Sequence, residues 1–131
     1  MVGFVVASHG EFCVGLKGST EMIAGEIPQC VAVPLQPGED PDQYGERLLS
    51  SLQEVDKGDG VILLVDLRGG TPFNRSLMLS REHNVIIVVG ANLPMLLTLA
   101  LGRNEDSTLL DLAHMAQEEA KESIGFIKYE G

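Results

Sequence analysis

Short apolar runs alternate with longer amphipathic segments along the chain, and this alternation limits the possible folds more than any other feature. The runs are rich in β-branched residues and predict strands at Val2 to Gly10, Gln29 to Val33, Val61 to Val65 and Val85 to Val89. Helical spacing predicts helices at Glu11 to Ala24, from Asp40 to Val55, at Pro72 to Arg81, from Leu93, and from Thr108 to Gly125. Strands that alternate with helices form a parallel sheet with helices on both faces and right-handed crossovers. We therefore predict an α/β, doubly wound fold with strand order 2-1-3-4.

The acidic balance of the chain excludes several classes of function. With 131 residues the chain is long enough for a sizeable core, and we expect residues 1–131 to form a single domain. A formal charge of −10 disfavours binding to nucleic acid or to an anionic membrane surface. We identify no signal peptide, and Leu93 to Leu101 is too short to cross a bilayer, so we expect a cytoplasmic protein. Cys13 and Cys30 lack metal-ligand spacing, and we expect neither a metal nor another cofactor.

Polar side chains follow the two strands that the predicted order places at the centre of the sheet. Ser8-His9-Gly10 ends the first strand, and Asp66 follows the third. The switch point of such a sheet lies between these strands, and ligands bind in the crevice beyond their carboxyl ends. Neighbouring strands lie about 4.8 Å apart, so the two side chains can meet. We predict that His9 and Asp66 are catalytic: Asp66 accepts the Nδ1 proton of His9 and leaves Nε2 as an oriented nucleophile.

The segment after Asp66 predicts a cradle for an anion. Gly69 and Gly70 precede a helix for which Thr71 is a good N-cap and Pro72 a good first residue. Backbone N–H groups and the positive end of the helix dipole bind anions at such a place, and the Thr71 hydroxyl offers a further donor. A nucleophilic nitrogen, an orienting carboxylate and an anion cradle together predict a histidine that carries a phosphoryl group.

Three motifs resemble the enzyme IIA component of the mannose-type phosphoenolpyruvate-dependent sugar phosphotransferase system. They are Ser8-His9-Gly10, the Asp-x-x-Gly-Gly-Ser/Thr-Pro-x-Asn loop from Asp66 to Asn74, and the Gly-x-Asn-x-Pro-Met stretch from Gly90 to Met95. The resemblance covers essentially the whole chain. It implies that the phosphocarrier protein HPr phosphorylates His9 on Nε2 and that His9 passes the group to the cognate IIB component. Membrane components IIC and IID are then indirect partners, and the sugar is not specified because a IIA protein never touches it.

Further residues of these motifs are candidates for contacts with partners. Arg68 departs from the family pattern, in which an apolar or aromatic residue is usual. This departure leaves three roles open for Arg68: contact with the phosphate, contact with a partner protein, or a solvated surface position. Asn92 and Met95 either bind a partner or serve the turn and the packing after the fourth strand. Arg75 is expected to face outward from the third helix.

Four other functions fit parts of the pattern. A histidine phosphatase or mutase needs an arginine before the histidine, where this chain has Ser8, and a longer chain. A response-regulator receiver needs an acidic pair after the first strand, where this chain has Ser8-His9. The phosphotransfer subunit of a dihydroxyacetone kinase shares the fold and the phosphohistidine, but its loop usually lacks the Gly-Thr-Pro-x-Asn form. We keep it as the alternative, followed by a non-enzymatic regulatory module of the same fold.

The C-terminal segment predicts a contact with a second chain. Gly125 is expected to end the last helix, and Phe126 to Tyr129 is long enough only for a short strand. A strand reached by so tight a turn runs antiparallel to its neighbours or leaves its own subunit. Unpaired edge strands invite pairing with another chain, exchange of a terminal element is a low-cost route to a dimer, and the family resemblance implies the same arrangement. We predict a homodimer in which Phe126 and Ile127 anchor a swapped strand.

Overall fold

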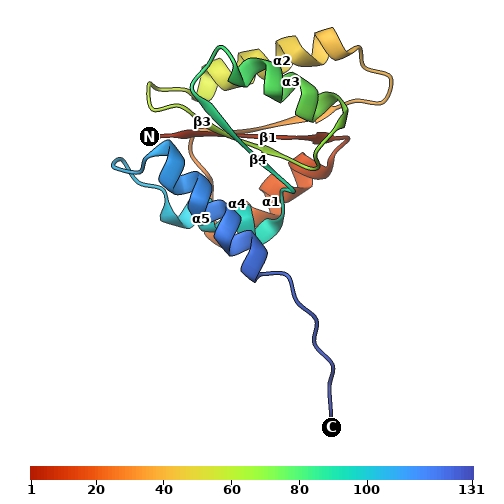
Figure 1. Cartoon of the computed structure of the whole chain (residues 1–131), viewed down its shortest axis with the longest axis vertical. Coiled ribbons are helices and arrows are strands. Elements are labelled where there is room, and N and C mark those ends of the chain that lie inside the picture. The colour runs from red at the N-terminus through yellow and green to blue at the C-terminus, as the bar shows by residue number, and fades with distance from the viewer.

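The computed structural model describes residues 1–131 and contains strands and helices in the predicted alternation (Figure 1). The strands are β1 (Gly3–His9), β2 (Cys30–Leu35), β3 (Val61–Val65) and β4 (Val85–Val89). The helices are α1 (Phe12–Ala24), α2 (Pro41–Val55), α3 (Gly70–Ser80), α4 (Leu93–Gly102) and α5 (Leu109–Glu122). None of these helices combines the length and the apolar character that a membrane crossing requires.

The sheet is parallel throughout, with the order β2-β1-β3-β4. This confirms the predicted strand order. In the central strand β1, Ala7 lies opposite Val33 of β2 on one side and Val65 of β3 on the other. The carboxyl ends of β1 and β3 are therefore neighbours, and His9 and Asp66 both lie at this end of the sheet.

Alternate residues of β1 belong to two separate hydrophobic cores. Phe4 and Val6 belong to the core beneath α1, α4 and α5, whereas Val5 and Ala7 belong to the core beneath α2 and α3 (Figure 1). All residues of β3 are buried as well. Because both central strands are packed on both faces, their carboxyl ends are held rigidly. This rigidity positions the side chains that follow them.

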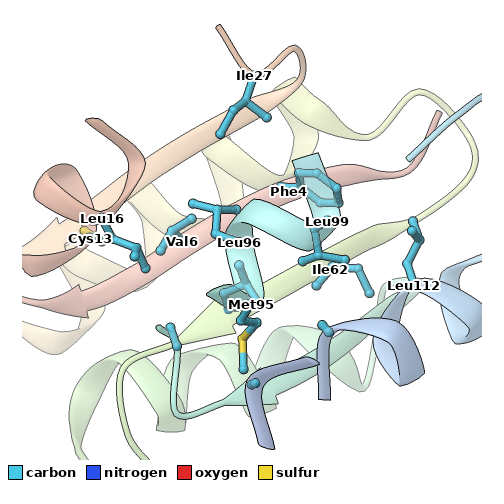
Figure 2. Packing of buried hydrophobic residues seen from close by; sticks show 14 of the residues in the cluster. Phe4, Val6, Cys13, Leu16, Ile27, Ile62, Met95, Leu96, Leu99 and Leu112 are labelled. Atoms are coloured by element: carbon cyan, nitrogen blue, oxygen red, sulfur yellow. The ribbon is translucent and has the colours of Figure 1, made fainter. Parts of the chain in front are cut away.

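The larger core lies between the sheet and helices α1, α4 and α5. Figure 2 shows Phe4 of β1 and Ile62 of β3 close to Leu96 and Leu99 of α4. All four side chains are fully buried, as is Leu112 of α5 to within 1%. Truncating such a leucine to alanine typically costs about 2–5 kcal/mol. The same packing fixes the start of α4, which follows β4 at the carboxyl end of the sheet.

Both edge strands differ from the prediction. β2 continues through Pro34 to Leu35, although Pro34 was expected to end it. Proline is tolerated in an edge strand because its missing N–H removes no bond on the open side, and β2 pairs only with β1. β4, expected as a buried strand from its apolar sequence, is only half-buried because it too is an edge strand.

The start of α3 also corrects the prediction, whereas the start of α5 agrees with it. The N-cap of α3 is Gly69 and its first residue is Gly70, so Thr71 lies in the first turn and is not the cap. Positive φ angles of 110° and 83° at the two glycines let the chain enter the helix earlier than the polar cap signal indicates. At α5, the Thr108 hydroxyl accepts a hydrogen bond from the Asp111 N–H at 3.2 Å, as a cap should.

The C-terminal segment does not form the predicted strand within its own chain. α5 ends at Glu122 with Ser123 as its C-cap, so Gly125 does not cap it, and no helix or strand follows. The last residues extend away from the body of the molecule (Figure 1). Phe126 and Ile127 are 96% and 100% exposed. Two large apolar side chains in this tail are thus left almost entirely uncovered by the chain that carries them.

Candidate active site

His9 is the last residue of β1 and projects from the carboxyl end of the sheet. Its side chain is 47% exposed, whereas the preceding residues of the strand are buried. Gly10 adopts a φ of 58°, and its N–H donates to the Leu35 carbonyl at 2.8 Å. The chain therefore turns sharply after His9 while it stays bonded to β2. This turn presents a half-exposed imidazole on a rigid backbone.

Ser8 ties the turn to the helix that follows. Its hydroxyl accepts a hydrogen bond from the Cys13 N–H at 2.8 Å and donates one to the Gly10 carbonyl at 3.0 Å. Ser8 is only 1% exposed. Its hydroxyl satisfies one of the N–H groups that a helix start leaves without an intrahelical partner. Sequence reasoning missed this positioning role, although a serine directly before the histidine and a helix directly after it were the available signals.

Asp66 holds the His9 ring and backbone together. Its Oδ2 lies 2.9 Å from His9 Nδ1 and accepts the His9 backbone N–H at 3.0 Å. Its Oδ1 accepts the Leu67 N–H at 3.0 Å, and the Asp66 side chain is 14% exposed. An ionised carboxylate only accepts hydrogen bonds, so Nδ1 carries the ring proton and Nε2 has a free lone pair. The structure thus brings the two predicted catalytic residues together.

Gly70 lies directly against the free nitrogen. A Cβ at this position would be 2.7 Å from His9 Nε2 and 2.9 Å from Cε1, closer than real Cβ atoms approach other atoms. Gly69 and Gly70 both have positive φ angles that glycine adopts readily. At Gly69 a Cβ would meet nothing within 4 Å. Gly70 is therefore the residue whose missing side chain leaves space beside Nε2.

The anion cradle predicted after Asp66 is the first turn of α3. Its opening residues are Gly70 and Thr71, and Thr71 is half-buried. The first N–H groups of a helix lack intrahelical acceptors and carry the positive end of its dipole. Because Gly70 adjoins Nε2, these donors lie beside the nitrogen on which a group would be transferred.

The three predicted partner residues lie in different surroundings. Arg68 is exposed in the loop between Asp66 and Gly69. The Asn92 side chain accepts the Met95 N–H at 2.9 Å and so caps α4. Met95 is 2% exposed and belongs to the hydrophobic core, which favours the packing role among the two alternatives considered for it.

Other reactive groups near the site are poor competitors of His9. Burial raises the pKa of the Cys13 thiol, which lowers the amount of thiolate at neutral pH. Of the three histidines, His9 alone pairs with a carboxylate. The structure contains no cluster of three or more His, Cys, Asp or Glu side chains suited to hold a metal ion.

A comparison with known families identifies the group to which this site belongs. The family model EIIA-man, described as "PTS system fructose IIA component", matches residues 3–117. The chain belongs to the EIIA-man family. This agrees with the resemblance that the three motifs around His9, Asp66 and Gly90 indicated.

Individual EIIA-man proteins are similar over most of this chain. The fructose-specific EIIA component of Bacillus subtilis is 32% identical over 95% of this chain and 85% of its own length. The mannose-specific EIIAB component of Escherichia coli is 30% identical over 97% of this chain, which spans only 40% of that longer protein. A crystal structure of EIIA from Streptococcus agalactiae matches with a TM-score of 0.88 and 29% identity, covering 96% of this chain and 97% of the other.

Proposed function

We propose that this chain is a phosphocarrier of the phosphoenolpyruvate-dependent sugar phosphotransferase system, acting as a single cytoplasmic domain. His9 accepts a phosphoryl group from phosphorylated HPr and passes it to a IIB component, which serves the membrane components IIC and IID. One observation carries the proposal, namely the orientation of the His9 ring. Its Nδ1 lies within hydrogen-bond distance of Asp66 Oδ2 at 2.9 Å, and its Nε2 faces the space left by the missing side chain of Gly70. The relatives described above are named as sugar-system components, and none is named as a dihydroxyacetone kinase subunit.

The proposed transfer follows from the two sides of the imidazole. The Nε2 lone pair forms a bond to phosphorus, and the bond between phosphorus and the donor imidazole breaks, with its electron pair returning to the donor. The His9 ring then carries a positive charge with its proton on Nδ1, and the Asp66 carboxylate beside it stabilises that cation. N–H groups at the start of α3 stabilise the negative oxygens. Transfer to the acceptor reverses these steps.

A direct labelling experiment tests this function. The chain is incubated with phosphoenolpyruvate, enzyme I and HPr, and intact mass reports the phosphoryl groups gained. We expect one group per chain, base-stable and acid-labile as a phosphohistidine is, in the wild type and in a His114→Ala control. The His9→Ala variant should gain none. Undiminished labelling of His9→Ala would refute the assignment. Transfer from HPr that was phosphorylated beforehand and freed of enzyme I should proceed unchanged in chelator, because alignment and charge stabilisation come from the protein groups.

We further propose that the chain forms a homodimer through its C-terminal tail. Phe126, Ile127 and Tyr129 are almost fully exposed, and the outer edge of β4 is unpaired. β4 consists only of valine and isoleucine, whereas the other edge strand contains Pro34. The edge of β4 is the better template for an added strand, because it contains no proline and so no residue that lacks a backbone N–H.

A further inference from the structure

Arg68 is an unpaired arginine in the loop that carries Asp66. It is exposed and forms no hydrogen bond or ion pair. In contrast, Arg47 and Arg75 pair with carboxylates at 3.0 Å and 2.8 Å, and Arg103 donates to backbone carbonyls. The chain has 19 acidic residues against 9 basic ones, so carboxylate partners are plentiful elsewhere. An arginine left free beside His9 is available to a carboxylate on another molecule.

The surroundings of Arg68 are basic and apolar. Arg68 lines a groove of about 480 Å³ between β4 and α5, to which α5 contributes His114 and Lys121. The side of the groove formed by β4 consists of residues 86–89 and is apolar. In the dimer proposed above, the tail of the second chain would lie along this apolar side, so the docking partner is assigned only to the charged side chains. No acidic residue lines the groove, although α5 carries exposed carboxylates such as Glu118 elsewhere on its surface. We refer to Arg68 and Lys121 as the basic flank.

The opposite side of His9 is acidic. Glu11 lies at the start of α1 and Asp40 directly before α2, and both are exposed and form no ion pair. Their neighbours Glu39 and Asp42 are instead neutralised by arginines. We refer to Glu11 and Asp40 as the acidic flank. Because the sheet order is β2-β1-β3-β4, the acidic flank beside β1 and β2 and the basic flank beside β4 lie on opposite sides of His9.

We propose that this charge polarity fixes the orientation in which transfer partners dock over His9, with Arg68 as a specificity-determining residue. The partner it fits is a protein whose transferring histidine has a carboxylate on one side, which meets the basic flank, and basic side chains on the other. A partner docked the opposite way would place like charges together, which costs affinity and slows association. The inference rests on the proposed phosphocarrier function and adds the determinant of partner recognition.

Charge reversal at Arg68 tests the proposal, and Arg81→Glu is the matched control. Arg81 is also exposed and forms no side-chain ion pair, but it follows the end of α3, far from His9 along the sheet, and its reversal gives the same net charge. Single-turnover transfer is measured from phosphorylated HPr to each variant, and from each phosphorylated variant to IIB, over a range of partner concentrations. Sedimentation velocity on the same samples reports the oligomeric state.

We expect Arg68→Glu to raise the half-saturating partner concentration roughly tenfold or more at low salt, as steering effects do. The effect should fade in roughly 1 M salt, where the Debye length is about 3 Å. The limiting transfer rate of Arg68→Glu should equal that of the wild type, because Arg68 forms no hydrogen bond or ion pair with His9. Glu11→Lys should weaken transfer in the same salt-dependent way, and Arg81→Glu should behave as the wild type. An effect on one of the two transfers alone would assign the basic flank to that partner.

Three results would overturn this inference while the proposed function stands. They are equal behaviour of Arg68→Glu and Arg81→Glu, a fall in the limiting rate with an unchanged half-saturating concentration, and a change in oligomeric state at Arg68→Glu. The second would show that Arg68 contacts the phosphoryl group, and the third that it lies between two copies of the chain. A wild type that phosphorylated HPr does not label would instead refute the phosphocarrier function itself.

Discussion

Substitution of Gly70 by alanine tests whether the open space at Nε2 makes His9 an acceptor. The added Cβ would lie 2.7 Å from Nε2 and 2.9 Å from Cε1, so the methyl group and the present ring cannot coexist. The backbone φ of 83° adds strain, roughly 1–2 kcal/mol for a residue with a side chain in the left-handed region. We expect the protein to remain folded, because the half-exposed His9 ring can rotate away.

The rate loss follows from what that rotation breaks. The ring would give up its 2.9 Å bond to Asp66, and a hydrogen bond to a charged group contributes about 1.5–3 kcal/mol. If that bond supports the charge that develops on the ring, transfer slows roughly 10- to 150-fold. The methyl group also occupies the approach of phosphorus to Nε2, so we expect a loss of at least about 100-fold.

Gly69→Ala is the control variant, because it strains the backbone in the same loop without placing a methyl group beside His9 Nε2. Gly69 has a φ of 110°, so alanine there is strained as well, but its Cβ would meet no atom within 4 Å. Both variants keep their backbone N–H groups. We expect Gly69→Ala to lower the free energy of unfolding by about 1–3 kcal/mol, because its φ of 110° and ψ of 161° lie in a region essentially confined to glycine. Gly70→Ala should lower it further, because the added methyl group also displaces the His9 ring. Only Gly69→Ala should keep near wild-type transfer.

Quenched-flow labelling by phosphorylated HPr measures the transfer rate, and urea unfolding measures the stability of each variant. Equal transfer rates in Gly69→Ala and Gly70→Ala, measured under conditions in which urea unfolding shows both to be folded, would refute the assignment of the acceptor space to Gly70. An unchanged rate in Gly70→Ala would show that Nε2 is not the acceptor nitrogen.

Three further substitutions probe other parts of the site and the tail. Asp66→Asn should keep the fold but slow labelling about tenfold for each 1.4 kcal/mol of lost stabilisation, and a wild-type rate would show that the pairing is dispensable. Ser8→Ala removes the acceptor of the buried Cys13 N–H and should lower the free energy of unfolding by about 1–3 kcal/mol; an unchanged urea midpoint would contradict this. Truncation after Ser123 should give monomer or aggregate in sedimentation while His9 remains in place, and a full-length monomer at micromolar concentration would refute the swap.

The strand order and the meeting of His9 with Asp66 could be predicted because both follow from hydrophobic pattern and crossover rules. β1 and β3 are buried on both faces, so their apolar runs leave no ambiguity about strand identity. Once the order is fixed, the ends of these two strands are neighbours by necessity. No side-chain detail was needed to predict that these two residues meet.

The errors occurred where neighbouring elements or backbone angles, and not the local hydrophobic and capping pattern, decide the conformation. Pro34 remains in a strand because β2 has a neighbour on one side only, which its local sequence does not reveal. Thr71 lost the cap position because two glycines with positive φ begin α3 earlier. Arg75 was expected to face outward, but its guanidinium lies across Gly45 of α2 and bonds Asp42 at 2.8 Å.

Chemistry and recognition occupy parts of the fold with different tolerance to change. His9 is held by the end of a strand buried on both faces, and a side chain at Gly70 would clash with its ring, so we expect substitution at either position to disturb the proposed acceptor nitrogen. Arg68 lies in the loop two residues before Gly70, yet it is exposed and forms no hydrogen bond or ion pair with the residues that orient His9. A change at Arg68 therefore alters which partner docks without disturbing the transfer geometry. Partner choice can then vary among proteins with one phosphoryl-transfer site, because the charges that select a partner lie outside the contacts that build the site.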